Sequence, residues 1–96
     1  MTDNKVYTIK MISGEEIVSR INKLEGMQEL IKPRTVMMGQ QGYGLAPWMM
    51  TSPDSNCIVS DTAIVAATET DSNVAQQYIK QTTGLDVGPP SGLILG

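Results

Sequence analysis

The sequence predicts a mainly β protein: a small, five-stranded, strongly bent antiparallel open barrel with a short C-terminal helix. Three observations predict it. The opening run, 7–11, alternates apolar and polar residues, as a strand with one buried face does. Helical spacing of apolar residues comes only after residue 71. Turn-forming residues recur at short intervals, at 13–14, 24–26, 39–44 and 52–56. A length of 96 residues suits one domain.

The first two strands are predicted to form a hairpin. Tyr7, Ile9 and Met11 share one face of the first strand. Ser13-Gly14 interrupts the run, and glycine accepts the positive φ that a tight turn often requires. The chain resumes at 15–21, where β-branched residues stand among charged ones, which favours a second strand.

The third strand, 27–38, is predicted to bend. It follows a second break at 24–26, and Pro33 lies near its middle. Because proline has no N–H to donate to a ladder, it marks a bulge, an edge position or a sharp bend. A bend at this point would curl a small sheet over itself, as an open barrel requires.

The second half of the chain is predicted to complete the barrel. Three glycines make 39–44 a loop, with Tyr43 at its tip. Residues 45–51 form the next strand, in which Pro47 favours an edge or kinked position. After a loop, a short apolar run and a turn, the final strand lies near 63–67. The apolar composition of that strand predicts burial on both of its faces.

A short helix is predicted over 72–82. Asp71-Ser72-Asn73 supplies side chains that can cap its start, and Gly84 ends it. One apolar stripe is formed by Val74, Ala75, Tyr78 and Ile79. A flexible N-terminus, 1–5, and a flexible tail, 84–96, flank the folded part. Within the tail, Leu93-Ile94-Leu95 either docks on another subunit or has no role.

Composition excludes several classes of function. The net charge of −3 offers no basic field for non-specific nucleic-acid binding. No apolar run approaches the roughly 18 residues of a membrane span, and no leader is evident. The absence of histidine excludes His-ligated metals and His-based acid–base chemistry. We therefore expect a protein without enzyme activity, catalytic residues, metal or cofactor. A single cysteine fits a reducing compartment, so the expected location is the cytoplasm.

Two groups could still carry chemistry. Glu15 and Glu16 would make a carboxylate pair, but we interpret them as solvated residues at a hairpin corner, because no histidine or metal-ligand cluster accompanies them. Cys57 is the only cysteine, which excludes an intramolecular disulfide. It could be a nucleophile, but without a histidine to deprotonate it we interpret it as a small buried hydrophobe.

Alternating apolar residues, a turn glycine and a branched apolar pair follow one another in Tyr7, Ile9, Met11, Gly14, Ile17, Val18 and Ile21. This order resembles the first Sm motif of the Sm-like (LSm) family. Lys32-Pro33 and Ala46-Pro47-Trp48 look similar to the divergent Sm-like proteins of phage and marine metagenomic origin. The resemblance covers 6–68 and implies one Sm-like barrel domain there. The same alternation also fits other small barrels of the SH3-like kind.

The resemblance implies a homo-oligomeric ring that binds single-stranded RNA. In the family an aromatic or apolar residue stacks on a base, an Asn contacts the base edge, and an Arg-Gly pair completes the site. In those places this chain has Met27-Gln28, Glu29 and Ser60-Asp61, so the base-contact residues are not retained. An open barrel also leaves two unpaired edges, and a head-to-tail contact between such edges closes into a ring when the rotation allows.

Two functions therefore remain open, and the first is a ring-forming RNA binder. Tyr43 would stack on a base. Phosphates would be held by five of the seven basic residues: Lys10, Arg20, Lys23, Lys32 and Arg34. The alternatives are a surface tyrosine and a solvated face on which these cations alternate with carboxylates.

The second function is a structural or adaptor module of a phage-like complex, which binds phage or host proteins but no nucleic acid. Contacts between subunits would use uncharged residues of the later strands: Trp48, Met49, Met50, Ile64 and Val65. The alternative is that the cluster of Trp and Met is ordinary core.

Overall fold

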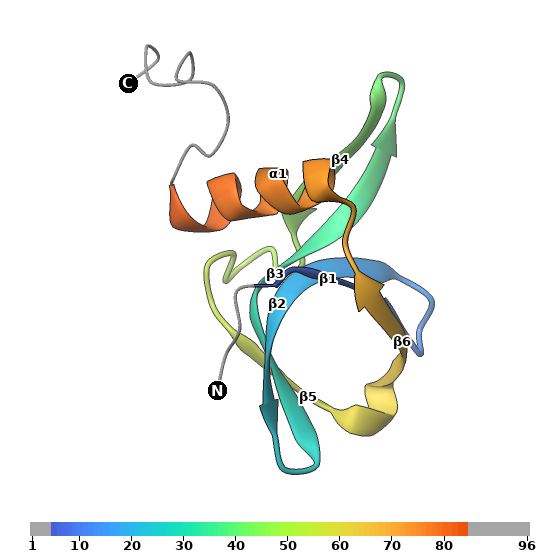
Figure 1. The fold of residues 1–96 in the computed structure, drawn as a ribbon, viewed down its shortest axis with the longest axis vertical. Helices are drawn as coiled ribbons and strands as arrows, with labels where there is room; N and C mark the ends of the chain where they lie inside the picture. The colour runs from blue at the N-terminus through green and yellow to red at the C-terminus, as the bar shows by residue number, and fades with distance from the viewer. Residues whose placement is uncertain (1–4, 85–96) are drawn as a thin grey trace.

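The computed structural model describes residues 5–84 and contains six strands, one 3-10 turn and one helix (Figure 1). The strands are β1 (Tyr7–Met11), β2 (Glu16–Leu24), β3 (Met27–Gly39), β4 (Gly42–Pro47), β5 (Cys57–Ser60) and β6 (Ile64–Glu69). The 3-10 turn spans Asp61–Ala63, and helix α1 spans Ser72–Thr83.

All six strands belong to one antiparallel sheet, ordered β4-β3-β2-β1-β6, with β5 paired to β3. The sheet curls until β5 and β6 approach each other across the 3-10 turn, but the barrel does not close (Figure 1). The predicted fold class, a mainly β open barrel with a C-terminal helix, is therefore confirmed. The sheet has one strand more than predicted, because the short run at Cys57–Ser60 pairs as a strand of its own.

The predicted interruption at Pro33 is a β-bulge. Val18 of β2 lies opposite Arg34, and Arg20 lies opposite Ile31. A single residue, Ser19, therefore faces both Lys32 and Pro33, which is the two-against-one arrangement of a bulge. Lys32 adopts a positive φ of 46°. On its other edge, β3 pairs with β5 before the bulge and with β4 after it, so the bulge is where one strand changes partner.

The β3–β4 hairpin is longer than predicted. The expected loop at 39–44 is reduced to a turn at Gln40-Gln41, because Gly42 takes a φ of 112° and starts β4 directly. Tyr43 lies in β4, opposite Met38, rather than at a loop tip. The predicted strand at 45–51 is wrong in its bounds: β4 ends at Pro47, and the residues after Trp48 leave the sheet.

Two apolar cores lie on opposite faces of the sheet. The first fills the barrel and is built on Ile9, Met11, Ile17 and Leu30. The second lies under α1 and consists of Val6, Val18, Val74 and Tyr78. Because successive strand residues point to opposite faces, β2 places Ile17 in one core and Val18 in the other. Helix α1 therefore covers the outer face of the barrel wall (Figure 1).

Helix α1 confirms its prediction to within a residue. The Asp71 carboxylate caps its start by accepting the N–H of Asn73. Gly84 ends it in the left-handed conformation with a φ of 75°. Val74, Tyr78 and Thr82, spaced four residues apart, are its buried positions.

Strand β6 contradicts its prediction. Burial on both faces was expected near 63–67, yet Val65 to Glu69 are exposed and only Ile64 packs against the barrel core. Composition suggested a covered strand, but within residues 5–84 the strand pairs with β1 alone and lies at the end of the sheet.

The predicted flexible ends, and with them Leu93-Ile94-Leu95, lie outside the described residues apart from Lys5 and Gly84. Within the described part of the chain, α1 is too short and too polar to cross a membrane, and it is the one α-helix there.

Candidate functional site

Arg34 was predicted to contact RNA, but the structure buries it. Its side chain is 4% exposed. The guanidinium donates to Gln81 Oε1 of α1 at 3.1 Å, to the carbonyl of Pro53 at 2.6 Å and to Asp54 Oδ1 at 3.4 Å. A planar guanidinium used on three sides joins β3, the loop after β4 and the helix. It leaves no accessible edge for a phosphate, so this part of the predicted RNA site is corrected.

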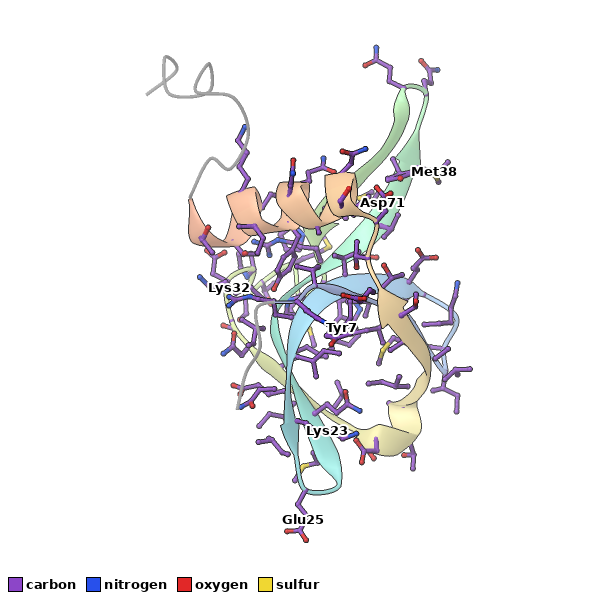
Figure 2. The ribbon with its side chains drawn as sticks, in the orientation of Figure 1. Tyr7, Lys23, Glu25, Lys32, Met38 and Asp71 are labelled. Atoms are coloured by element: carbon purple, nitrogen blue, oxygen red, sulfur yellow. The ribbon has the colours of Figure 1, made fainter. Side chains whose placement is uncertain are left out.

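Lys32 is also used inside the fold. Its Nζ donates to the carbonyl of Thr82 at 2.9 Å, in the last turn of α1 (Figure 2). The carbonyls of a last helical turn lack partners within the helix, and a cation there also complements the helix dipole. The bulge residue thus anchors the C-terminal end of the helix.

Arg20 lies at the same junction. Its backbone N–H donates to the Tyr78 hydroxyl at 3.2 Å, and that hydroxyl donates to the carbonyl of Ile31. The hydroxyl is therefore inserted between β2 and β3 where the bulge interrupts their ladder. The Arg20 Nε is buried and has no hydrogen-bond partner among the described residues.

The remaining predicted RNA contacts are at the surface but far apart. Lys10 pairs with Glu16 at 3.6 Å, and both side chains are about half exposed. Lys23 lies near the β2–β3 turn, at the opposite end of the molecule from the β3–β4 hairpin that carries Tyr43 (Figures 1 and 2). The structure therefore does not gather Lys10, Arg20, Lys23, Lys32, Arg34 and Tyr43 on one face.

The predicted subunit-interface residues divide into two groups. Trp48 and Ile64 pack against the barrel core of their own chain. Met49, Met50 and Val65 are exposed, with 43%, 85% and 64% of their surface accessible. The interpretation of the cluster as core thus holds for Trp48, whereas the two methionines after it lie at the surface.

The Glu15 carboxylate, at the turn between β1 and β2, accepts hydrogen bonds from two side chains of its own chain. The Ser13 hydroxyl donates to one carboxylate oxygen, and the Trp48 indole N–H donates to the other at 3.2 Å. These bonds, that from Ser13 foremost, lower the pKa of Glu15 below its ordinary value of 4.5. A carboxylate held ionised in this way is a hydrogen-bond acceptor for the Trp48 side chain and a poor proton donor near neutral pH.

Cys57 packs beside the barrel core. Partial burial raises the pKa of its thiol, which lowers the fraction of reactive thiolate. Within residues 5–84 no three His, Cys, Asp or Glu side chains come close enough together to hold a metal ion.

The far end of the β3–β4 hairpin was missed as a surface. It extends past α1 (Figure 1) and carries Met37, Met38 and Tyr43, which are 55%, 78% and 53% exposed. The signal available in the sequence was the pair Met37-Met38, since adjacent apolar residues at the end of a strand cannot both face one core.

The second exposed apolar feature is the free edge of β6. The strand's sequence, Ile-Val-Ala-Ala-Thr-Glu, has no charge before Glu69, and among residues 5–84 only β1 pairs with it. A bulge at Val65 interrupts the pairing once. From Ala66 to Glu69 the register with β1 is regular.

No protein-family model matches the sequence, and no curated protein matches it either. The Sm-like resemblance stays a prediction. The features of the described chain that bear on function are therefore these two exposed apolar surfaces and the dispersal of the basic residues.

Proposed function

We propose that this chain is a structural or adaptor module that associates with copies of itself through the free edge of β6. The observation that carries the proposal is an exposed edge strand without charge from Ile64 to Thr68. Such an edge presents unpaired N–H and C=O groups and is a template for another strand. Natural sheet edges are commonly protected by lysines, prolines or bulges, and here one bulge leaves 66–69 regular.

The geometry of association follows from which edge β6 meets. If β6 pairs with β6 of a second copy, the contact is two-fold and gives a dimer. If it pairs with β5 or β4 of a second copy, the contact is head-to-tail and closes into a ring when the rotation allows. The carbonyl of Leu45 in β4 already accepts Gln81 Nε2 at 3.1 Å, so part of the β4 edge is covered by the helix. This favours β5 as the partner edge in a ring.

RNA binding is less well supported than protein binding. The side chains of Arg34 and Lys32 donate hydrogen bonds to α1 and are not available to phosphates. Lys10 has an acidic neighbour in Glu16, and the net charge is −3. Affinity for nucleic acid depends on neutralising several phosphates together, which dispersed cations do poorly.

The proposal is tested by the molar mass of the full chain from light scattering. We expect a multiple of the single-chain mass: two chains for the two-fold contact, more for a ring. The variant Val65→Glu/Ala66→Glu places charge on the edge and is expected to reduce the mass to one chain. Ala66 is exposed and lies opposite Lys10, which also pairs with Glu16, so a glutamate introduced there has a cation beside it and we expect the fold to be retained.

The matched control is Met37→Glu/Met38→Glu, which adds the same charge at two adjacent exposed apolar positions of the β3–β4 hairpin, outside β5 and β6. It is expected to keep the mass of the parent chain. A parent chain with the mass of one copy at every concentration would remove the proposal.

The other candidate function, RNA binding, is tested by fluorescence polarisation with short oligo-U and oligo-A at about 50 mM salt. Binding that weakens steeply with added salt would favour RNA binding over the proposed protein contact.

A further inference from the structure

An open cleft of about 390 Å³ lies between the far half of the β3–β4 hairpin and the start of α1. Its apolar lining includes Val18, Val36 and Val74, which belong to the core under the helix. Met38 and Tyr43 of the hairpin form its exposed side. Figure 2 shows Met38 on the hairpin, at one side of the cleft, and Asp71 at the beginning of the helix, at the other side of the cleft. The volume is at the small end of the range for ligand pockets and suits a few side chains.

The charge of this cleft has one sign. Its lining, as residues 5–84 define it, contains the carboxylates of Glu16 and Asp71 and no Lys or Arg. Asp71 is held in place because one of its oxygens accepts the N–H of Asn73 at 3.1 Å. That bond also satisfies the positive end of the helix dipole with a carboxylate, so the helix start does not favour an anionic ligand. The pair between Glu16 and Lys10 is about half exposed, so solvent screens it.

We propose that this cleft binds an extended segment of a partner protein in which aliphatic residues alternate with Lys or Arg. The surface that an aliphatic side chain removes from water belongs mainly to Met38 and Tyr43, which are 78% and 53% exposed. Val18 and Val74 are already buried, so they offer apolar contact and little further surface to bury. The neighbouring cation reaches Glu16 or Asp71, and the ring of Tyr43 offers it a cation–π contact. Met38 is unbranched and adapts to the shape of the segment. The inference rests on the proposed protein-binding role and does not require self-association.

Charge complementarity also decides against the chain's own C-terminal segment as the occupant. Residues 85–96 contain Asp86 and no Lys or Arg. They could bring Leu93, Ile94 and Leu95 to the apolar lining but no cation to the two carboxylates. A basic partner segment matches both parts of the cleft.

The test is a titration of the ¹⁵N-labelled full chain, followed by NMR amide shifts. The probes are two capped hexapeptides, one alternating leucine with lysine and one alternating leucine with glutamate. We expect the leucine–lysine peptide to shift the amides of the cleft, at 36–45 and 70–74, in a saturable way. The leucine–glutamate peptide is expected to leave them unchanged.

One double variant and its control test the part played by the carboxylates of the cleft, and a third variant tests the Tyr43 ring. Glu16→Gln/Asp71→Asn removes both charges, while asparagine keeps the helix cap. It is expected to weaken binding of the leucine–lysine peptide about tenfold. The matched control, Glu25→Gln/Asp61→Asn, removes two carboxylates away from the cleft and is expected to leave the affinity unchanged.

Tyr43→Ala removes the aromatic ring from the cleft. It is expected to weaken binding of the leucine–lysine peptide at least about fivefold.

The inference is overturned if both peptides shift the same amides equally, or if the leucine–lysine peptide leaves the cleft amides unshifted. It is also overturned if Leu93→Ser/Ile94→Ser/Leu95→Ser moves the cleft amides of the full chain without any peptide, because residues 85–96 would then occupy the cleft. Light scattering on the same samples separates this result from the association of copies. A single-chain protein that binds the peptide supports the cleft and contradicts the β6 contact.

Discussion

Single residues hold α1 to the barrel at the bulge in β3. Tyr78 inserts its hydroxyl between β2 and β3, Lys32 reaches the last turn of the helix, and Arg34 joins the helix to the loop after β4. Each of these polar groups satisfies backbone or side-chain groups that burial would otherwise leave unpaired. The polar contacts at this junction therefore have larger consequences than the exposed ion pairs of the molecule.

Replacement of Tyr78 by phenylalanine isolates the hydroxyl. The Arg20 N–H would lose its side-chain acceptor, whereas the Ile31 carbonyl would keep the Ser19 hydroxyl at 3.2 Å. We expect the free energy of unfolding in urea to fall by about 2 kcal/mol. The control Tyr43→Phe removes an exposed hydroxyl and is expected to change it by less than about 0.5 kcal/mol. Equal effects of the two substitutions would contradict the role assigned to Tyr78.

Substitution of Arg34 by lysine tests the buried guanidinium. An ammonium group cannot reproduce the three separate donations to Gln81, Pro53 and Asp54. We expect a loss of about 2–3 kcal/mol in the free energy of unfolding. Arg20→Lys is the matched comparison, because the Nε it removes has no partner among the described residues, and it is expected to cost under about 1 kcal/mol. An Arg34→Lys chain as stable as the parent would show that the guanidinium is not holding these elements together.

The pKa of Glu15 is expected to lie below 4.5 in the folded chain, as measured by NMR titration of its side-chain carboxyl. Because the folded pKa is lowered, the stabilisation from Glu15 is fully present above the unfolded pKa and is lost as the pH falls through the folded pKa. Ser13→Ala removes the hydrogen bond that lowers the Glu15 pKa most. It is therefore expected to raise this pKa more than Trp48→Phe does. A parent midpoint at or above 4.5 would contradict the hydrogen bonds described at this corner.

Among the elements, some were predictable from local pattern and others were not. The β1–β2 hairpin and α1 follow from alternation, turn residues and caps, all of which act between neighbours in sequence. The burial of Arg34 could not be predicted, because it depends on α1 and a distant loop arriving on the same side of β3. The exposure of β6 likewise depends on its place in the sheet order, whereas its composition resembles that of a covered strand.

The bounds of the β3–β4 hairpin depend on one glycine. Gly42 has a φ of 112°, which an L-amino acid rarely adopts, whereas Gly44 is not among the glycines with positive φ. Gly42→Ala is expected to destabilise the hairpin by about 1–2 kcal/mol, seen as faster amide exchange at 37–44. The matched control is Gly44→Ala, whose added methyl group meets open space, and it is expected to leave the exchange unchanged. Equal exchange in the two variants would contradict this turn geometry.

At the scale of the whole molecule, the chain is a curled sheet with one core inside and a second under α1. The helix protects the outer face of β2, but no described element lies along the free edge of β6. A small open barrel therefore retains a strand edge that can pair with another chain. If copies associate at β6, the largest change in protection of backbone amides is expected on that strand.

Hydrogen exchange of the full chain at rising protein concentration is the sharpest test of association through β6. We expect amides within Ile64–Glu69 to become more protected as copies associate, while amides of α1 keep a constant exchange rate. Exchange in β6 that is equally fast at every concentration, in samples where α1 remains protected, would contradict it.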